Sequence, residues 1–431
     1  MLFNSSLFGD YARAQRTFGV LVCSAWLSSH ALAQTESQLP VPAPPSAPTL
    51  KQALGAAWQL SPSTRAEGNR RSELAAKEKA ATSWISGEPV AGIAHRTDGL
   101  NRNEGFREYE AALELPLWNP GVRAAAQADV SAQRMGFDGQ FSVAKLKLAG
   151  ELRKLSASIA TAQVELDLNK RKLFEATALA EDLSRRVKAG ENARVDGLQS
   201  QVVQQQAQAA IAQAESQLSR YQSQWRSLTG MSTVAPPDEL LASSLSGQSD
   251  EATVSADHPA LRFALAQVGS AQARLALAFA DKRDPMSVGL GVARERANFA
   301  GANDTKLRIA LRIPLGGDNR NAPRQAAAAA ELDTAQADLD AAQRQLPAEV
   351  VAAISDLRAA RAAQTAARER VRLSTEVQTL ITKSWRLGDS DLPTRLRADN
   401  EQFEASLSLA RTSIDVKRAI ANLNQAHGLL P

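Results

Sequence analysis

Cysteine and histidine are nearly absent from this sequence of 431 residues, which has one cysteine and four histidines. The cysteine, Cys23, lies in an apolar N-terminal segment. The histidines beyond that segment, His95, His258 and His427, form no pair four residues apart. We therefore expect no disulfide and no thiolate metal site beyond the N-terminus. Protein metal sites need clustered ligands, so we also predict no resident metal ion and no cofactor.

Aromatic residues make up only 5% of the chain, whereas alanine and glutamine recur throughout it. This composition favours long helices that pack through narrow seams over a single thick core. The sequence also lacks the G-x-S-x-G, phosphate-binding-loop and H-E-x-x-H motifs. An exported enzyme with a helical appendage has no motif in its favour, and we predict that the protein is not an enzyme.

Strong charge and long apolar runs are missing as well. The formal net charge of +4 is small for this length, and no block of basic residues occurs. Nucleic-acid binding needs Lys and Arg gathered on one face, so we expect no nucleic-acid partner. Beyond the N-terminus, no run stays apolar over the ~20 residues that a membrane-spanning helix needs.

The N-terminus has the pattern of a secretory signal. Arg13 and Arg16 precede a short apolar run over 18–27, and Ala-Leu-Ala at 31–33 is a small-residue cleavage site. We therefore predict a signal peptide over 1–33, cleaved after Ala33, and export of the remaining chain.

The rest of the chain repeats its landmarks at an offset of 197 to 198 residues. The matching segments are Ser61-Pro62 and His258-Pro259, Leu113–Leu117 and Leu311–Leu315, and Lys188–Glu191 and Arg386–Asp389. A period this long indicates a duplicated half-protein rather than a solenoid of short repeats. We predict a Pro-rich mobile leader over 34–48, a first repeat over 49–230, a linker over 231–257 and a second repeat over 258–431.

Each repeat contains two segments in which apolar and polar residues alternate, predicted as strands over 89–97, 107–117, 286–296 and 305–315. Alternation over about ten residues is typical of tilted membrane strands. One face of these strands is largely apolar, and the other carries acidic side chains in the first repeat and basic ones in the second. We predict that the charged side chains line the lumen of a barrel: Glu108, Glu110, Glu114, Lys306, Arg308 and Arg312.

Four strands cannot close a membrane barrel, because an open edge in lipid would leave backbone groups unpaired. Membrane strands here would therefore have to be pooled from several protomers. Trp84 and Trp118 bracket the first hairpin, where we expect the aromatic residues of a membrane interface. The alternative is two soluble hairpins, each with its apolar face on helices, in a periplasmic coiled-coil adaptor or scaffold.

Long helical patterns follow each hairpin, over about 121–188 and 322–386, and shorter helices return over 195–228 and 393–429. Some 65 helical residues at about 1.5 Å each span roughly 100 Å, which is typical of a coiled-coil or tubular assembly. A compact Gly-containing turn separates each long helix from its return helix.

Four further segments of sequence occur in a recognisable order. They are Thr49–Leu54, Leu115–Leu117, the turn from Gly190 to Leu198, and Leu218 to Gly230. With the duplicated plan of helix, hairpin, long helix, turn and helix, the chain resembles the TolC-like outer-membrane efflux family over nearly its whole exported length.

The resemblance implies a mainly α protein with a small membrane β part, in which three protomers form a twelve-stranded barrel on a helical periplasmic tunnel. It implies a homotrimer in outer-membrane lipid that passively conducts substrate received from a periplasmic adaptor (membrane fusion) protein and a proton-driven inner-membrane pump. The chain is most similar to the heavy-metal cobalt–zinc–cadmium branch. Drugs and type I secreted proteins are the alternative cargoes.

In that family the turn end of the helices closes the tunnel and contacts the adaptor. The matching residues here are Gly190, Glu191, Asp196, Gly388, Asp389 and Asp391. Carboxylates that project inward there would form an anionic ring at the entrance. The alternative for Asp196 and Asp391 is that they cap the return helices, which the helix dipole favours.

Overall fold

The computed structural model describes residues 47–242, 254–316 and 318–431, and the predicted signal peptide and most of the predicted leader lie outside them. The first repeat contains α1 (Leu50–Leu60), α2 (Pro62–Thr82), β1 (Val90–Thr97), β2 (Arg107–Leu117), α3 (Val122–Lys188) and α4 (Arg194–Thr229). The second contains α5 (Pro259–Ala280), β3 (Met286–Arg296), β4 (Asp304–Arg312), α6 (Asp318–Leu387) and α7 (Leu392–Ala426).

The repeated Ser-Pro and His-Pro landmarks start equivalent helices. Ser61 ends α1 and its hydroxyl accepts a hydrogen bond from the Ser63 amide, with Pro62 in the first turn of α2. In the second repeat, His258 accepts from the Ala260 amide through Nδ1, with Pro259 at the start of α5. A side-chain acceptor followed by proline suits a helix start, because these first amides have no partner inside the helix.

The four strands form one antiparallel sheet in the order β1-β2-β3-β4, with the first repeat's hairpin paired to the second's through β2 and β3. Its outer strands, β1 and β4, each have one edge without a partner strand in the described chain. The fourth strand ends at Arg312, three residues before the predicted end at 315. Pro314 in that tail has no amide hydrogen for a strand ladder, which favours an earlier end.

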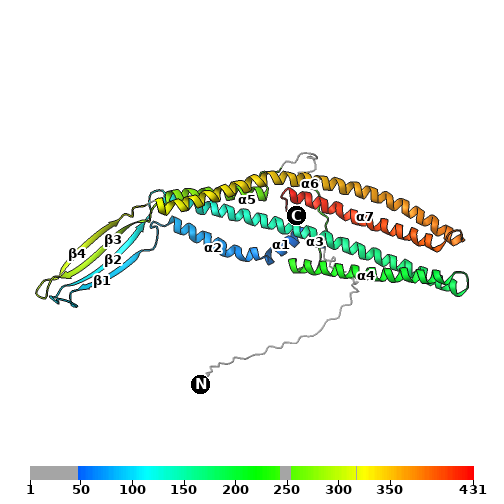
Figure 1. Ribbon diagram of the computed structural model, residues 1–431, viewed down its shortest axis with the longest axis horizontal. Coiled ribbons are helices and arrows are strands. Elements are labelled where there is room, and N and C mark those ends of the chain that lie inside the picture. The colour runs from blue at the N-terminus through cyan, green and yellow to red at the C-terminus, as the bar shows by residue number, and fades with distance from the viewer. Residues whose placement is uncertain (1–46, 243–253, 317) are drawn as a thin grey trace, which may run out of the picture. The chain divides into compact units, whose positions relative to one another are not determined.

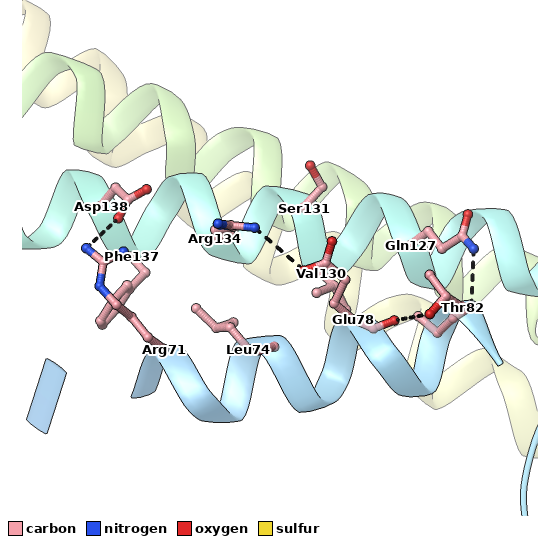
Figure 2. Close-up of a pocket in the computed structure, with 12 residues that line it drawn as sticks. Arg71, Leu74, Glu78, Thr82, Gln127, Val130, Ser131, Arg134, Phe137 and Asp138 are labelled. Carbon is pink, nitrogen blue, oxygen red and sulfur yellow. Dashed lines mark hydrogen bonds and ion pairs between the residues drawn. The ribbon is translucent and has the colours of Figure 1, made fainter. Parts of the chain in front are cut away.

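The helices keep the order of the strands they adjoin. Next to the sheet, α2 packs on α3, α3 on α5, and α5 on α6. Since α2 leads into β1, β2 into α3, α5 into β3 and β4 into α6, one layer of four strands continues as one layer of four helices (Figure 1). Toward the turns, α4 packs on α3, α3 on α7, and α7 on α6, again in a single row.

Two turns close the helix pairs at the end away from the sheet (Figure 1). The α3–α4 turn contains Gly190 with φ +80°, and the α6–α7 turn contains Gly388 with φ +86°. Both angles lie in the left-handed region, which glycine adopts without the steric cost that a side chain would bring. The two repeats therefore use the same turn chemistry at equivalent positions.

The main core lies midway along the helices, where α1, α3 and α4 meet the segment that follows α4. Trp225 is fully buried there, and its indole N–H donates to the Thr233 carbonyl at 3.0 Å. Arg153 of α3 binds Glu239 through two hydrogen bonds, 2.8 Å from Nε and 2.5 Å from Nη2. The first part of the predicted linker is thus fastened to α3. Among the described residues, no helix is long and apolar enough to cross a membrane.

Candidate channel surfaces

The charged residues predicted to line a lumen all lie on one face of the sheet. Glu110 of β2 and Arg308 of β4 form an ion pair of 2.5 Å, although a whole strand separates them. Arg312 of β4 lies 3.4 Å from Glu114 of β2 in the same way. The acidic strand and the basic strand therefore neutralise each other across β3.

Small side chains on β3 leave room for these pairs. Four successive positions on the charged face of β3 hold small residues, namely Ser287, Gly289, Gly291 and Ala293. Gly291 sits opposite Arg308 in the register, so the arginine can extend over the strand toward Glu110. The Ser287 hydroxyl adds a hydrogen bond to the Glu114 carboxylate. The glycines of β3 thus make space for the ion pairs that cross the strand. The alternating pattern of the sequence does not reveal this role.

The remaining predicted lumen residues are paired as well. Lys306 binds Glu295 on the adjacent strand, and Arg96 of β1 lies 3.3 Å from Glu108. All six predicted side chains are brought together on one face, each with a partner of opposite charge. Exposed pairs of this kind stabilise a fold little, so their main effect is to fix the charge pattern of the surface. Their role in lining a lumen remains a prediction.

The opposite face of the sheet is apolar and exposed. Ile93, Leu307 and Ile309 expose 91%, 71% and 72% of their surface. Ala111 and Val292 complete the row between Ile93 and Leu307, and Ile309 lies in the next row opposite Leu290. The helices do not cover this face, unlike in the soluble-hairpin alternative. A contiguous exposed apolar patch of this kind marks contact with a membrane or a partner.

The two predicted interface tryptophans lie where the sheet meets the helices. Trp84 is 67% exposed and follows the end of α2. Trp118 follows β2, and its indole N–H donates to the Ser83 carbonyl at 3.0 Å. Both therefore lie at the end of the sheet that adjoins the helices, and their place in a membrane interface remains a prediction.

The acidic residues at the two turns differ in what they do. Asp391 is the N-cap of α7, where its carboxylate accepts from the Thr394 amide at 3.0 Å. Hydrogen bonding from Thr394 lowers the pKa of Asp391 below its ordinary value. Asp196 lies in the first turn of α4 after the N-cap residue Ala193, so the capping alternative is wrong for this residue. Its carboxylate accepts instead from the side-chain Nδ2 of Asn192 at 3.2 Å.

The other turn positions present backbone and exposed side chains. Glu191 and Asp389 are exposed, and their amides donate to the carbonyls of Arg186 and Ser384 as the turns close. An anionic entrance ring and adaptor contact at these residues, together with Gly190 and Gly388, remain predictions.

Near the turns, a tryptophan joins the two helix pairs, a contact that sequence reasoning missed. The ring of Trp385 on α6 contacts the guanidinium groups of Arg186 on α3 and Arg395 on α7, which lie 4.8 and 4.1 Å from its centre. Leu183 and Leu392 pack beside it. Burial lowers the pKa of Arg395, and the nearby Asp399 carboxylate opposes this shift. The sequence feature that could have indicated this contact is a tryptophan, rare in this chain, three residues before the turn glycine Gly388.

Comparisons with known proteins address the fold. No protein-family model matches the chain. It is 30% identical over 297 residues to protein CyaE of Bordetella pertussis, an alignment that covers 63% of this chain and 60% of CyaE. The chain thus spans less than two thirds of that relative.

Solved structures of other proteins match the fold of this chain over most of its length. The outer membrane protein VceC of Vibrio cholerae matches with a TM-score of 0.70 and 14% identity, over 88% of this chain and 96% of VceC. The open state of the MtrE outer membrane channel of Neisseria gonorrhoeae matches at 0.68 with 16% identity, over 89% of each chain. The chain has the fold of these outer-membrane proteins. Its mainly helical layout with one small sheet is the fold predicted from the resemblance.

Proposed function

We propose that three copies of this chain form a passive channel across the outer membrane. The observation that carries this proposal is the four-stranded sheet, which has one exposed apolar face, one charged face and two unpaired edges. In lipid, each unpaired backbone group costs several kcal/mol, so the edges must meet edges of other copies. Three copies of four strands give a barrel of twelve, with apolar side chains toward lipid and ion pairs toward a water-filled lumen.

The helices support the same closure. Each row of helices has two free edges in the described chain. The edges are α2 and α6 in the row near the sheet, and α4 and α6 in the row near the turns. A ring of three copies would join these edges as it joins the strands. The 67 residues of α3 would extend the duct by roughly 100 Å. At its turn end, a periplasmic adaptor and an inner-membrane pump would deliver the cargo.

For the cargo we propose heavy-metal cations, on the resemblance to the cobalt–zinc–cadmium branch. The paired charges on the sheet favour neither sign of cargo, so organic drugs and type I secreted proteins are competing classes. A strain that lacks the gene separates the three. Zinc or cadmium sensitivity supports metal cargo, drug sensitivity supports the second class, and loss of a secreted protein from the medium supports the third.

The experiment that tests the channel uses the full chain, extracted from outer-membrane fractions in detergent. We expect a trimer by native mass spectrometry and stepwise ion conductance in a planar bilayer. A protein that purifies as a monomer without detergent and does not conduct would overturn the channel. It would instead support the soluble periplasmic scaffold.

A further inference from the structure

The apolar face of the sheet changes character over its last two rows before the strand turns. Arg107 of β2 sits directly opposite Arg296 of β3, and Tyr109 sits opposite Arg294. Residues two apart on a strand share a face, so all four belong to the face that carries Ile93 and Leu307. His95 continues the row, with its ring stacked on Tyr109 at 4.4 Å. Three arginines and a histidine thus gather at one end of an otherwise apolar surface.

These arginines are not balanced by neighbouring acids. Among the described residues, Arg107 and Arg294 have no ion-pair partner, and both are exposed. The nearest acids along their strands, Glu108 and Glu295, point to the other face, where Arg96 and Lys306 bind them. Like charges placed opposite each other weaken a sheet, so this arrangement calls for an anionic partner from outside the chain.

The third arginine is held in place by the turns. Arg296 donates from Nε to the Gly105 carbonyl at 3.4 Å, and its guanidinium lies 5.7 Å from the centre of the Phe299 ring. The Phe299 amide donates to the Glu104 carbonyl, which ties the two turns together. Gly105 has φ +98°, and a Cβ there would lie 2.5 Å from the Phe299 nitrogen. Only glycine permits this close approach, so the turn positions Arg296 beside the other two arginines.

In the proposed barrel, these two rows would lie at the level of the lipid headgroups. The next row toward the helices is already apolar, with Ile93, Ala111, Val292 and Leu307 in register. An arginine on a lipid-facing strand is strongly unfavourable at the bilayer centre and costs little near the interface. Phe299, 60% exposed in the adjacent turn, adds an aromatic side chain at the same end. The sheet turns lie away from the helices, so this end would face the cell exterior (Figure 1).

We propose that Arg107, Arg294 and Arg296 form a binding site for the phosphate groups of an anionic glycolipid in the outer leaflet. The site rests on the proposed function, because it needs the apolar face to contact lipid. Guanidinium groups bind phosphate oxygens with paired hydrogen bonds, which makes arginine well suited to this ligand. Neighbouring side chains of a sheet lie within roughly 8 Å of one another, close enough for one phosphorylated sugar headgroup to contact several arginines. The bound lipid would neutralise the facing charges and hold the barrel at a fixed depth.

The experiment compares the full-length trimer with the double variant Arg107→Gln/Arg294→Gln. The probe is lipid A, a glucosamine disaccharide with two phosphates, titrated into detergent-solubilised protein and followed by native mass spectrometry. We expect the double variant to bind lipid A roughly 30-fold more weakly. Each arginine near a membrane surface strengthens binding about fivefold, and the variant loses two of them. The control is Arg308→Gln/Arg312→Gln, which removes the same charge from the same sheet on its other face and should leave binding unchanged.

Two further arms identify the ligand. Lipid A without phosphates should bind the wild-type trimer as weakly as lipid A binds the double variant. Inorganic phosphate at millimolar concentration should not displace the lipid, because the acyl chains of the lipid contact the apolar rows of the sheet. Displacement by phosphate would indicate a site for free phosphate and overturn the lipid assignment. Equal lipid A binding by wild type and double variant, in trimers that conduct ions, would overturn the site while leaving the channel intact. A soluble, non-conducting wild type would overturn the channel itself.

Discussion

At the scale of single residues, a rare aromatic side chain holds two helix pairs together near the turns. Two guanidinium groups contact the ring of Trp385, one from Arg186 on α3 and one from Arg395 on α7. The side chain of Trp84 is 67% exposed, whereas that of Trp385 is 8% exposed and makes its contacts inside the chain. The two tryptophans thus differ in burial, which the sequence alone does not show.

We predict that Trp385→Ala loosens the contact between α3 and α7 near the turns. Each cation–π contact contributes about 0.5–1 kcal/mol, so the variant should lose roughly 1–2 kcal/mol of local stability. Trypsin should then cleave near Arg186 and Arg395 several times faster, and conductance in a bilayer should rise if these turns close the duct. The control is Phe174→Ala, which removes an aromatic ring that is 77% exposed on α3, the helix that carries Arg186. Equal behaviour of the two variants would contradict the role of Trp385.

At the scale of elements, β3 acts as a spacer that lets β2 and β4 interact over it. The small side chains of Gly289 and Gly291 allow ion pairs to lie across the strand rather than beside it. A sheet built this way can carry many charges on one face and still remain nearly neutral there. Changing one member of a pair therefore exposes the charge of the other.

We predict that Glu110→Arg moves the channel toward anion selectivity and Arg308→Glu toward cation selectivity. An unmatched charge a few ångströms from a passing ion is worth about 1 kcal/mol in water, so the permeability ratio should change roughly fivefold. The combined variant Glu110→Arg/Arg308→Glu restores an opposite pair and should return the ratio to that of the wild type. Reversal potentials in a bilayer with a salt gradient measure all three. Thr305→Lys, on the other face of β4, is the control and should not change the ratio.

The sequence predicted the elements well and their interactions poorly. Alternation located β2 and β3 at the bounds that the structure has, because a period of two is a local property of the chain. It could not reveal that Arg308 reaches Glu110, since that pair depends on strand order and on glycines 180 residues or so from β2. Nor could it separate Asp391, which caps a helix, from Asp196, which lies one turn deeper. A carboxylate near a helix start fits either position, and the backbone decides between them.

At the scale of the whole assembly, the unpaired edges are the feature that a single chain cannot satisfy. The β1 edge and the β4 edge run antiparallel, as successive strands of the sheet do. One copy's β4 can therefore continue into another copy's β1 with the same kind of ladder. Because the helix rows end at equivalent edges, one rotation can close strands and helices together.

We predict that cysteines placed on the two edges link different copies. In a background without Cys23, Ile93→Cys on β1 and Leu307→Cys on β4 put thiols on the same face at opposite edges. Neighbouring strands lie about 4.8 Å apart, so a bismaleimide with a spacer of about 10 Å should join them even with a small shift in register. Denaturing gels should show dimer and trimer bands and nothing larger, because a closed ring leaves no free edge. The control pair Ala111→Cys and Val292→Cys are register partners within one chain and should give linked monomer only. A ladder that continues beyond the trimer would mean open association through the edges, and absence of any link between copies would mean that the edges do not meet.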